Sequence, residues 1–159
     1  MADNREENLA ALEDAFFENI FVSPKLAVPH NKEIVVIACI LEGGEQIIQT
    51  AVYEQQENGA EAWYCGKPFT TLLYWYSLKN FERLAKSPKK LAPLDRKIVV
   101  VSCRLENGDI VYQTAIYLDH GKGRTEWIYG QKCEKILMWS SLPKVPERGL
   151  FIPKIGLIQ

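Results

Sequence analysis

The stretch TLLYWYSL, residues 71–78, returns 64 positions later as KILMWSSL, residues 135–142. Both versions are rich in apolar side chains, and both end on the pattern Trp-x-Ser-Leu. The same offset aligns residues 17–82 with residues 81–146 without a gap. About 24 of roughly 66 aligned pairs are identical, far above the ~6% expected of unrelated chains. The sequence therefore predicts a unit that the chain contains twice.

The two copies predict the same order of elements. Each begins with a short helical lead that ends at Ser-Pro, because proline disfavours helix at the residue before it. A β-branched run, a glycine-containing turn and a second extended run then predict a hairpin. A third short strand follows, and a fourth carries the opening motif. In the first copy these strands fall at 34–41, up to Tyr53, around Trp63 and at 71–78, which predicts a four-stranded antiparallel meander.

A single sheet of this size has exposed edges and buries little apolar surface, so we expect the two sheets to pack together. The predicted fold class is mainly β (α+β): a tandem duplication of a small antiparallel four-stranded β-unit, with an N-terminal amphipathic helix and a short inter-repeat helix. Large aromatic side chains dominate such cores, because each removes some 150–250 Å² from water. The side chains expected on the inner sheet faces are Trp63, Trp127, Trp75 and Trp139.

Two extensions lie outside the repeat. Residues 4–20 place Leu9, Leu12 and Phe16 at helical spacing, which predicts an amphipathic helix. The tail GLFIPKIGLIQ, from Gly149, is apolar, so we expect it to pack as an extra edge strand or to reach a second subunit in a homodimer. The predicted divisions are the N-terminal helix and lead (1–24), the first β repeat (25–80), a linker helix (81–90), the second β repeat (91–147) and the C-terminal tail (148–159).

The composition is that of a globular protein, with 47% hydrophobic and 25% charged residues among 159. No apolar run approaches the roughly 18–20 residues needed to cross a bilayer, and the acidic N-terminus is unlike a secretory signal. We therefore expect a cytoplasmic location and no membrane contact. The four cysteines form no CxxC pair and have no histidine nearby, so neither zinc nor another metal is expected.

Two of these cysteines, Cys39 and Cys103, sit inside the apolar runs IVVIACIL and IVVVSCRL. A free cysteine in such a run usually packs as a small hydrophobic residue, and this interpretation is favoured over a reactive thiol or a disulfide. The low cysteine content and the expected free thiols indicate a reducing compartment.

Charge separates the two copies. Residues 25–81 carry a net charge of about −2, whereas residues 89–145 carry about +4. Basic and aromatic side chains on a sheet can hold single-stranded nucleic acid, which makes nucleic-acid or nucleotide binding the alternative function. The acidic N-terminal segment packing over the basic copy, or meeting it across a dimer, explains the same charges. The candidate binding residues are Arg104, Lys122, Arg124, Trp127, Tyr129 and Lys132.

No catalytic constellation is apparent, so we do not expect an enzyme or a cofactor. The two histidines, His30 and His120, occupy different repeat positions and lie beside no evident partner, and no GxSxG motif is present. A polar pair recurs in mid-strand as Gln49-Thr50 and Gln113-Thr114. Each glutamine either bonds neighbouring backbone or lines a small polar site, because a buried amide must be satisfied.

The end of the second copy, MWSSLPKVPE at residues 138–147, resembles the close of a small family of unknown function common in phage and prophage genomes. The resemblance covers about residues 90–147, and the first copy follows it loosely because Leu78 is followed by lysine. Family members often have a histidine before the tryptophan, where this chain has Tyr74 and Met138. The resemblance implies a mobile-element setting. We therefore expect a non-catalytic binding protein in the host cytoplasm that inhibits a host defence or regulatory protein complex.

Overall fold

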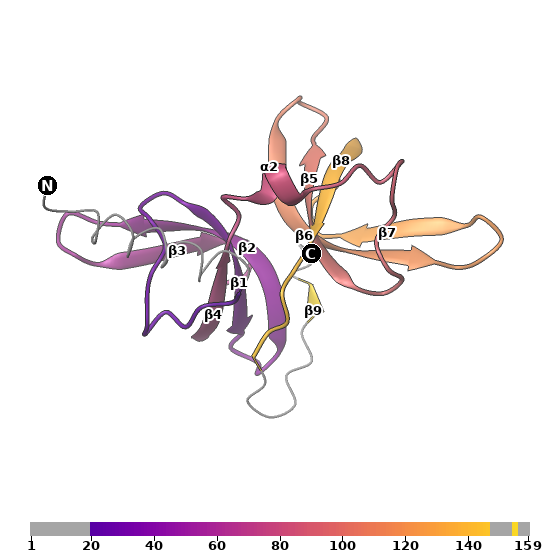
Figure 1. The fold of residues 1–159 in the computed structure, drawn as a ribbon. Coiled ribbons are helices and arrows are strands. Elements are labelled where there is room, and N and C mark those ends of the chain that lie inside the picture. The colour runs from indigo at the N-terminus through magenta and orange to yellow at the C-terminus, as the bar shows by residue number, and fades with distance from the viewer. Residues whose placement is uncertain (1–19, 147–153, 156–159) are drawn as a thin grey trace, which may run out of the picture.

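A computed structural model describes residues 20–146 and residues 154 and 155 (Figure 1). The helix expected at residues 4–20 and most of the expected tail lie outside the described residues. The described part of the chain is mainly β, with one short helix. Its elements are β1 (Ile34–Ile40), β2 (Gln46–Gln55), β3 (Glu61–Cys65), β4 (Thr71–Ser77), α2 (Phe81–Leu84), β5 (Ile98–Arg104), β6 (Ile110–Asp119), β7 (Thr125–Tyr129), β8 (Lys135–Ser141) and β9 (Lys154–Ile155).

The eight long strands form two four-stranded antiparallel sheets with the same topology. The strand order is β3-β2-β1-β4 in the first and β7-β6-β5-β8 in the second. The registers match at the offset of 64 residues, since Val35 pairs with Ala51 and Val99 pairs with Ala115. Even the irregularities coincide, because the pairing to the fourth strand shifts after Ala38 in one sheet and after Ser102 in the other. The predicted repeated sheet unit is confirmed.

The expected meander is wrong in one respect, because the fourth strand returns to pair with the first. This strand order is that of a Greek key. The physical reason lies in β1, whose residues 35–39 are all buried. A strand buried on both faces reads as a continuous apolar run, and it needs a neighbour on each side. A meander would leave this strand at the edge of the sheet.

Each unit has a core of its own on the outer face of its sheet. In the first unit Val22, Val35, Ile37 and Trp75 are buried together, and in the second Val99, Val101 and Trp139 are buried together. The lead segment before β1 or β5 folds back over this face. Lead residues Val22 and Lys86 bridge to Trp75 and Trp139, respectively.

The tryptophans therefore lie in the two outer cores, and the prediction that they pack between the sheets is wrong. The reason is the indole N–H, which needs a hydrogen-bond partner when it is buried. The Trp75 Nε1 donates to the Ala27 carbonyl at 2.8 Å, and the Trp139 Nε1 donates to the Leu91 carbonyl at 2.8 Å. The lead segment supplies both carbonyls.

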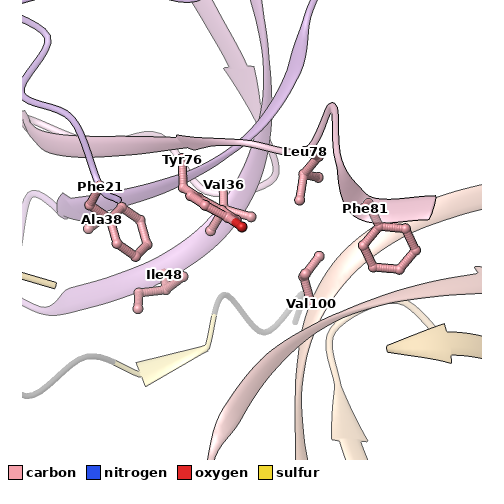
Figure 2. Close-up of a cluster of buried hydrophobic side chains, with 8 residues drawn as sticks. All are labelled: Phe21, Val36, Ala38, Ile48, Tyr76, Leu78, Phe81 and Val100. Atoms are coloured by element: carbon pink, nitrogen blue, oxygen red, sulfur yellow. The ribbon is translucent and has the colours of Figure 1, made fainter. Parts of the chain in front are cut away.

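A third apolar cluster joins the two units (Figure 2). Val36, Ala38, Ile48 and Tyr76 from the first sheet meet Val100 from the second, while Phe21 packs on Tyr76 with ring centroids 5.7 Å apart. The connection between the units contributes Leu78 and Phe81 to the same cluster. Burying one such side chain stabilises the fold by about 1.5–3 kcal/mol. The cluster thus stabilises the packing of each unit against the other.

The inter-repeat helix is short. It covers Phe81–Leu84 and ends at Ala85, whose backbone is extended with φ −71° and ψ 149°. Residues 85–90 of the segment predicted as a linker helix form a bridge and a turn. Phe81 is the buried residue of this helix, and its ring lies 5.0 Å from the ring of Tyr112. The helix therefore packs the segment between the two units against the second sheet.

The short strand β9 belongs to the predicted apolar tail. It pairs in parallel with β2, Lys154 opposite Ile47 and Ile155 opposite Ile48, which confirms an added strand at this position. Figure 1 shows β9 between the two units, where it contacts β6 as well. No helix in the described residues is long and apolar enough to cross a membrane.

Candidate functional site

The two units meet through the first halves of β2 and β6, and the contact is reciprocal. The Thr50 hydroxyl donates to the Tyr112 carbonyl at 3.1 Å, and the Thr114 hydroxyl donates to the Ile48 carbonyl at 3.0 Å. Thr50 and Thr114 are repeat equivalents, and so are Ile48 and Tyr112. The same two repeat positions, the threonine and the residue two places before it, therefore contact each other in both directions, as in an isologous dimer interface. Here one chain supplies both halves.

The glutamine beside each threonine faces the other way, into its own unit. Gln49 donates to the Lys67 carbonyl at 2.7 Å and accepts from the Lys67 N–H at 3.0 Å. Gln113 makes the equivalent bonds to Gln131 at 2.8 and 2.9 Å. Hydrogen bonding of the mid-strand glutamines to backbone is confirmed, and both glutamines also line a groove between the units. Each glutamine fixes the loop that carries the chain from the third strand to the fourth.

A groove of about 510 Å³ lies beside this contact. A volume of this size is typical of small-ligand sites. One wall comes from β1, β2 and β3 of the first unit, and the other comes from the start of β6. Within the described part of the chain, no charged side chain lines it. Its polar side chains include Gln49, Thr50, Gln113 and Thr114.

Three exposed apolar side chains converge on this groove. Ile34 is 40% exposed, Tyr64 is 53% exposed and Ile110 is 61% exposed, and all three line the groove. Large apolar side chains exposed singly are ordinary, but several gathered around one depression mark an interaction surface. Ile110 is the clearest, because its repeat equivalent in the first unit is the polar Gln46.

The basic residues predicted to form a site do not come together. Arg104 ends β5, and Lys132 lies in the loop whose Glu134 N–H donates to the Arg104 carbonyl at 2.8 Å. Lys122 and Arg124 lie at the tip of the β6–β7 hairpin, at the opposite end of β6. Ten residues of strand separate the two ends, which is about 30 Å. The structure thus forms two small basic groups in place of one patch.

The two aromatic candidates, Trp127 and Tyr129, are half-buried in the core of the second unit. Trp127 packs edge to face on Tyr117 with ring centroids 5.0 Å apart, as Trp63 packs on Tyr53 at 4.7 Å in the first unit. Burial, followed by the neighbouring Cys133, raises the pKa of the Tyr129 hydroxyl. A contact that both units keep is explained by their shared fold.

All four cysteines are free thiols. Cys39 and Cys103 are fully buried, and the prediction that they pack as core residues is confirmed. Burial raises the pKa of each of these thiols from 9.0 to about 11, although each accepts a hydrogen bond from the neighbouring glutamine. Such thiols are neutral at physiological pH and poor nucleophiles.

One histidine has a partner that sequence reasoning missed. His120 Nε2 lies 3.0 Å from a carboxylate oxygen of Glu126, across the exposed end of the β6–β7 hairpin. The six-residue separation bridges a turn, so strand pairing brings the two together. Among the residues described, no group of three or more His, Cys, Asp or Glu side chains is placed to hold a metal ion.

The apolar groove residues Ile34, Tyr64 and Ile110 were also missed from the sequence, since their proximity depends on how the two units pack. The sequence carried one sign of this surface at Ile110, an apolar residue at the start of a strand where the first copy has Gln46. A comparison with known protein families, curated proteins and solved structures finds no match to this chain.

Proposed function

We propose that this chain is a non-catalytic protein-binding module whose binding surface is the groove between β2 and β6. The observation that carries the proposal is the convergence of Ile34, Tyr64 and Ile110 on one uncharged depression. An apolar surface of this kind gains free energy when a partner removes it from water. The fixed threonines and glutamines beside it supply orientation.

We further infer that the two units derive from the duplication of one ancestral unit that paired with a second copy of itself. The ungapped repeat, the matching registers and the reciprocal Thr50 and Thr114 bonds support this origin. A fused pair need not remain symmetric. One unit can therefore change a residue at the interface without the same change in the other unit, as Ile110 in place of glutamine illustrates.

The host partner and the inhibitory role stay predictions that rest on the resemblance to a phage-associated family. The test is a pull-down from bacterial lysate with and without nuclease, using the parent chain and the variants I110E and L94E. Both positions are exposed leucine or isoleucine, at 61% and 68%, but Leu94 does not line the groove. Capture of one protein that I110E abolishes and L94E keeps supports the proposal.

Capture that is equal for both variants, or that depends on nucleic acid, contradicts the proposal. Nucleic-acid binding stays the alternative, and fluorescence titration with short single strands at two salt concentrations tests it. Phosphate contacts give an affinity that falls steeply as salt rises. The separation of Lys122 and Arg124 from Arg104 and Lys132 favours protein binding over this alternative.

A further inference from the structure

The strand β9 shows what one edge of this fold accepts. On the side of β2 away from β1, β3 pairs with residues 51–55 only. The remaining edge, at Ile47 and Ile48, carries β9 in parallel orientation. A sheet edge presents unpaired N–H and C=O groups, and an extended segment satisfies them. The tail segment 154–155 therefore completes the first unit by strand addition.

The second unit has the same edge without the added strand. On the side of β6 away from β5, β7 pairs with residues 115–119 only. Val111 and Tyr112 are the repeat equivalents of Ile47 and Ile48, and within the described residues no strand pairs with them on this side. Ile47 and Ile48 are buried, whereas Val111 and Tyr112 are half-buried. Both Val111 and Tyr112 line the groove.

Strand alternation points the Tyr112 backbone toward the groove. The His120 N–H donates to the Arg124 carbonyl, so His120 points its backbone groups toward the β7 side. Because backbone direction alternates along a strand, the N–H and C=O groups of the even-numbered residues of β6 also point to the side of β6 away from β5. The Tyr112 carbonyl already accepts the Thr50 hydroxyl. The Ile48 carbonyl accepts the Thr114 hydroxyl in the same way, and β9 pairs there nonetheless. The threonine bond is therefore compatible with an added strand.

A second copy of this chain cannot fill these edges completely. Each chain has two equivalent edges, at β2 and β6, but the segment 154–155 occurs once. Exchange of this segment between copies moves it from one edge to another and leaves half of the edges without it. Exchange of the tail segment therefore cannot fill every β6 edge.

We propose that the groove takes an extended segment of a partner protein, which adds to β6 as a parallel strand at Val111 and Tyr112. This inference rests on the proposed function and specifies its ligand. The side chains that the segment turns toward the groove are apolar. Ile34, Tyr64 and Ile110 line the groove, and no charged side chain among the described residues there compensates a buried charge. The site is continuous with the Thr50–Tyr112 contact, and its binding mode is β-strand addition.

The chain itself supplies the probe. A fluorescein-labelled peptide with the sequence GLFIPKIGLIQ, residues 149–159, is titrated against the 159-residue chain and followed by anisotropy. The expected result is one peptide per chain with a dissociation constant of about 1–100 µM, since a short strand buries little surface. I110E is expected to weaken binding at least about tenfold by placing a charge against the apolar side chains of the peptide, and L94E to leave it unchanged.

A second peptide tests the binding mode. It carries proline in place of both Ile155 and Gly156, which removes two backbone donors, while Lys154 and the net charge stay as in the parent peptide. Loss of binding by this peptide supports strand addition. Equal binding of both peptides, no binding at about 1 mM, or equal affinity for I110E and the parent chain overturns the inference. An affinity that rises tenfold when residues 1–19 are deleted also overturns it, because that segment then fills the groove.

The two proposals fail in different ways. If I110E abolishes capture of a lysate protein while the proline peptide binds as well as its parent, the protein-binding function stands and strand addition is wrong. If the peptide binds as expected but lysate capture is the same for I110E and L94E, the groove accepts a strand and is not the surface that captures the protein. The proposed function then fails.

Discussion

Thr50 and Thr114 donate hydrogen bonds across one interface in opposite directions, to the carbonyls of Tyr112 and Ile48 at 3.1 and 3.0 Å. The relation joins the two sheets beside a groove, on the side of β6 where no strand of the described residues is added. The position of the groove therefore follows from the symmetry of the contact. The asymmetry arises because β9 adds to only one of the two equivalent edges.

The threonine hydroxyls are expected to contribute measurably to stability. Replacing Thr114 with valine keeps the shape and removes the donor, which is expected to lower the free energy of unfolding by about 1 kcal/mol. T50V is expected to cost less, because Thr50 is half-buried while Thr114 is buried. Urea denaturation of both variants gives these differences. Unchanged stability in T114V would show that its hydrogen bond does not hold the units together.

The shared cluster predicts that the two units unfold together. Val36 and Val100 are repeat equivalents, both are fully buried, and both belong to the cluster between the sheets. Either substitution to alanine is expected to cost about 1–3 kcal/mol by leaving a cavity. Each unit holds two tryptophans, Trp63 and Trp75 in the first and Trp127 and Trp139 in the second. The double variants W63F/W75F and W127F/W139F therefore keep tryptophan in one unit only and report that unit by fluorescence.

Coincident unfolding transitions in the W63F/W75F and W127F/W139F backgrounds are expected both without further change and with V100A added. Two transitions at different urea concentrations would show that each unit is an independent folding unit.

Replacing either of the buried glutamines, Gln49 or Gln113, is expected to lower the free energy of unfolding strongly. In Q113M the Gln131 N–H and carbonyl lose their partner, so the free energy of unfolding is expected to fall by about 1–3 kcal/mol. Q49M is expected to behave alike, because Gln49 makes the same bonds to Lys67. Q55A is the matched control, since the Gln55 side chain is exposed. A loss in Q55A equal to that in Q113M would contradict the role of the buried amide.

The buried thiols predict a loss of stability in alkaline solution. Burial raises the pKa of Cys39 and Cys103 from 9.0 to about 11 in the folded chain. The unfolded chain ionises first, so the contribution of these thiols is complete below pH 9 and is lost as the pH rises toward 11. The stability of the C39A/C103A variant is expected to depend less on pH in this window. Identical pH profiles would contradict burial of the neutral thiols.

Much of the fold could be predicted from the sequence, because the signals are local. The β-branched runs and glycine turns place β1, β2 and their equivalents, and the offset of 64 predicts that both units repeat one structure. The Greek-key order was missed, although the unbroken apolar run IVVIAC indicated a strand buried on both faces. The location of the tryptophans was missed because it depends on carbonyls of the lead segment.

The candidate site could not be predicted in the same way. Ile34, Tyr64 and Ile110 lie on different strands, and Ile110 belongs to the other unit. They meet only because the two sheets join through Thr50 and Thr114, which is a long-range relation. Charge was a misleading guide, since Arg104 pairs with Ile110 at the start of β6 whereas Lys122 follows the end of β6.

Amide hydrogen exchange at Ile48 and Tyr112 tests the central claim most directly, because the claim is that one of two equivalent strand edges is filled and the other is open. NMR exchange on the chain without ligand is predicted to find the Ile48 amide protected by β9 and the Tyr112 amide exchanging much faster. Addition of the peptide GLFIPKIGLIQ is predicted to protect Tyr112. Equal protection of both amides without the peptide would contradict the account.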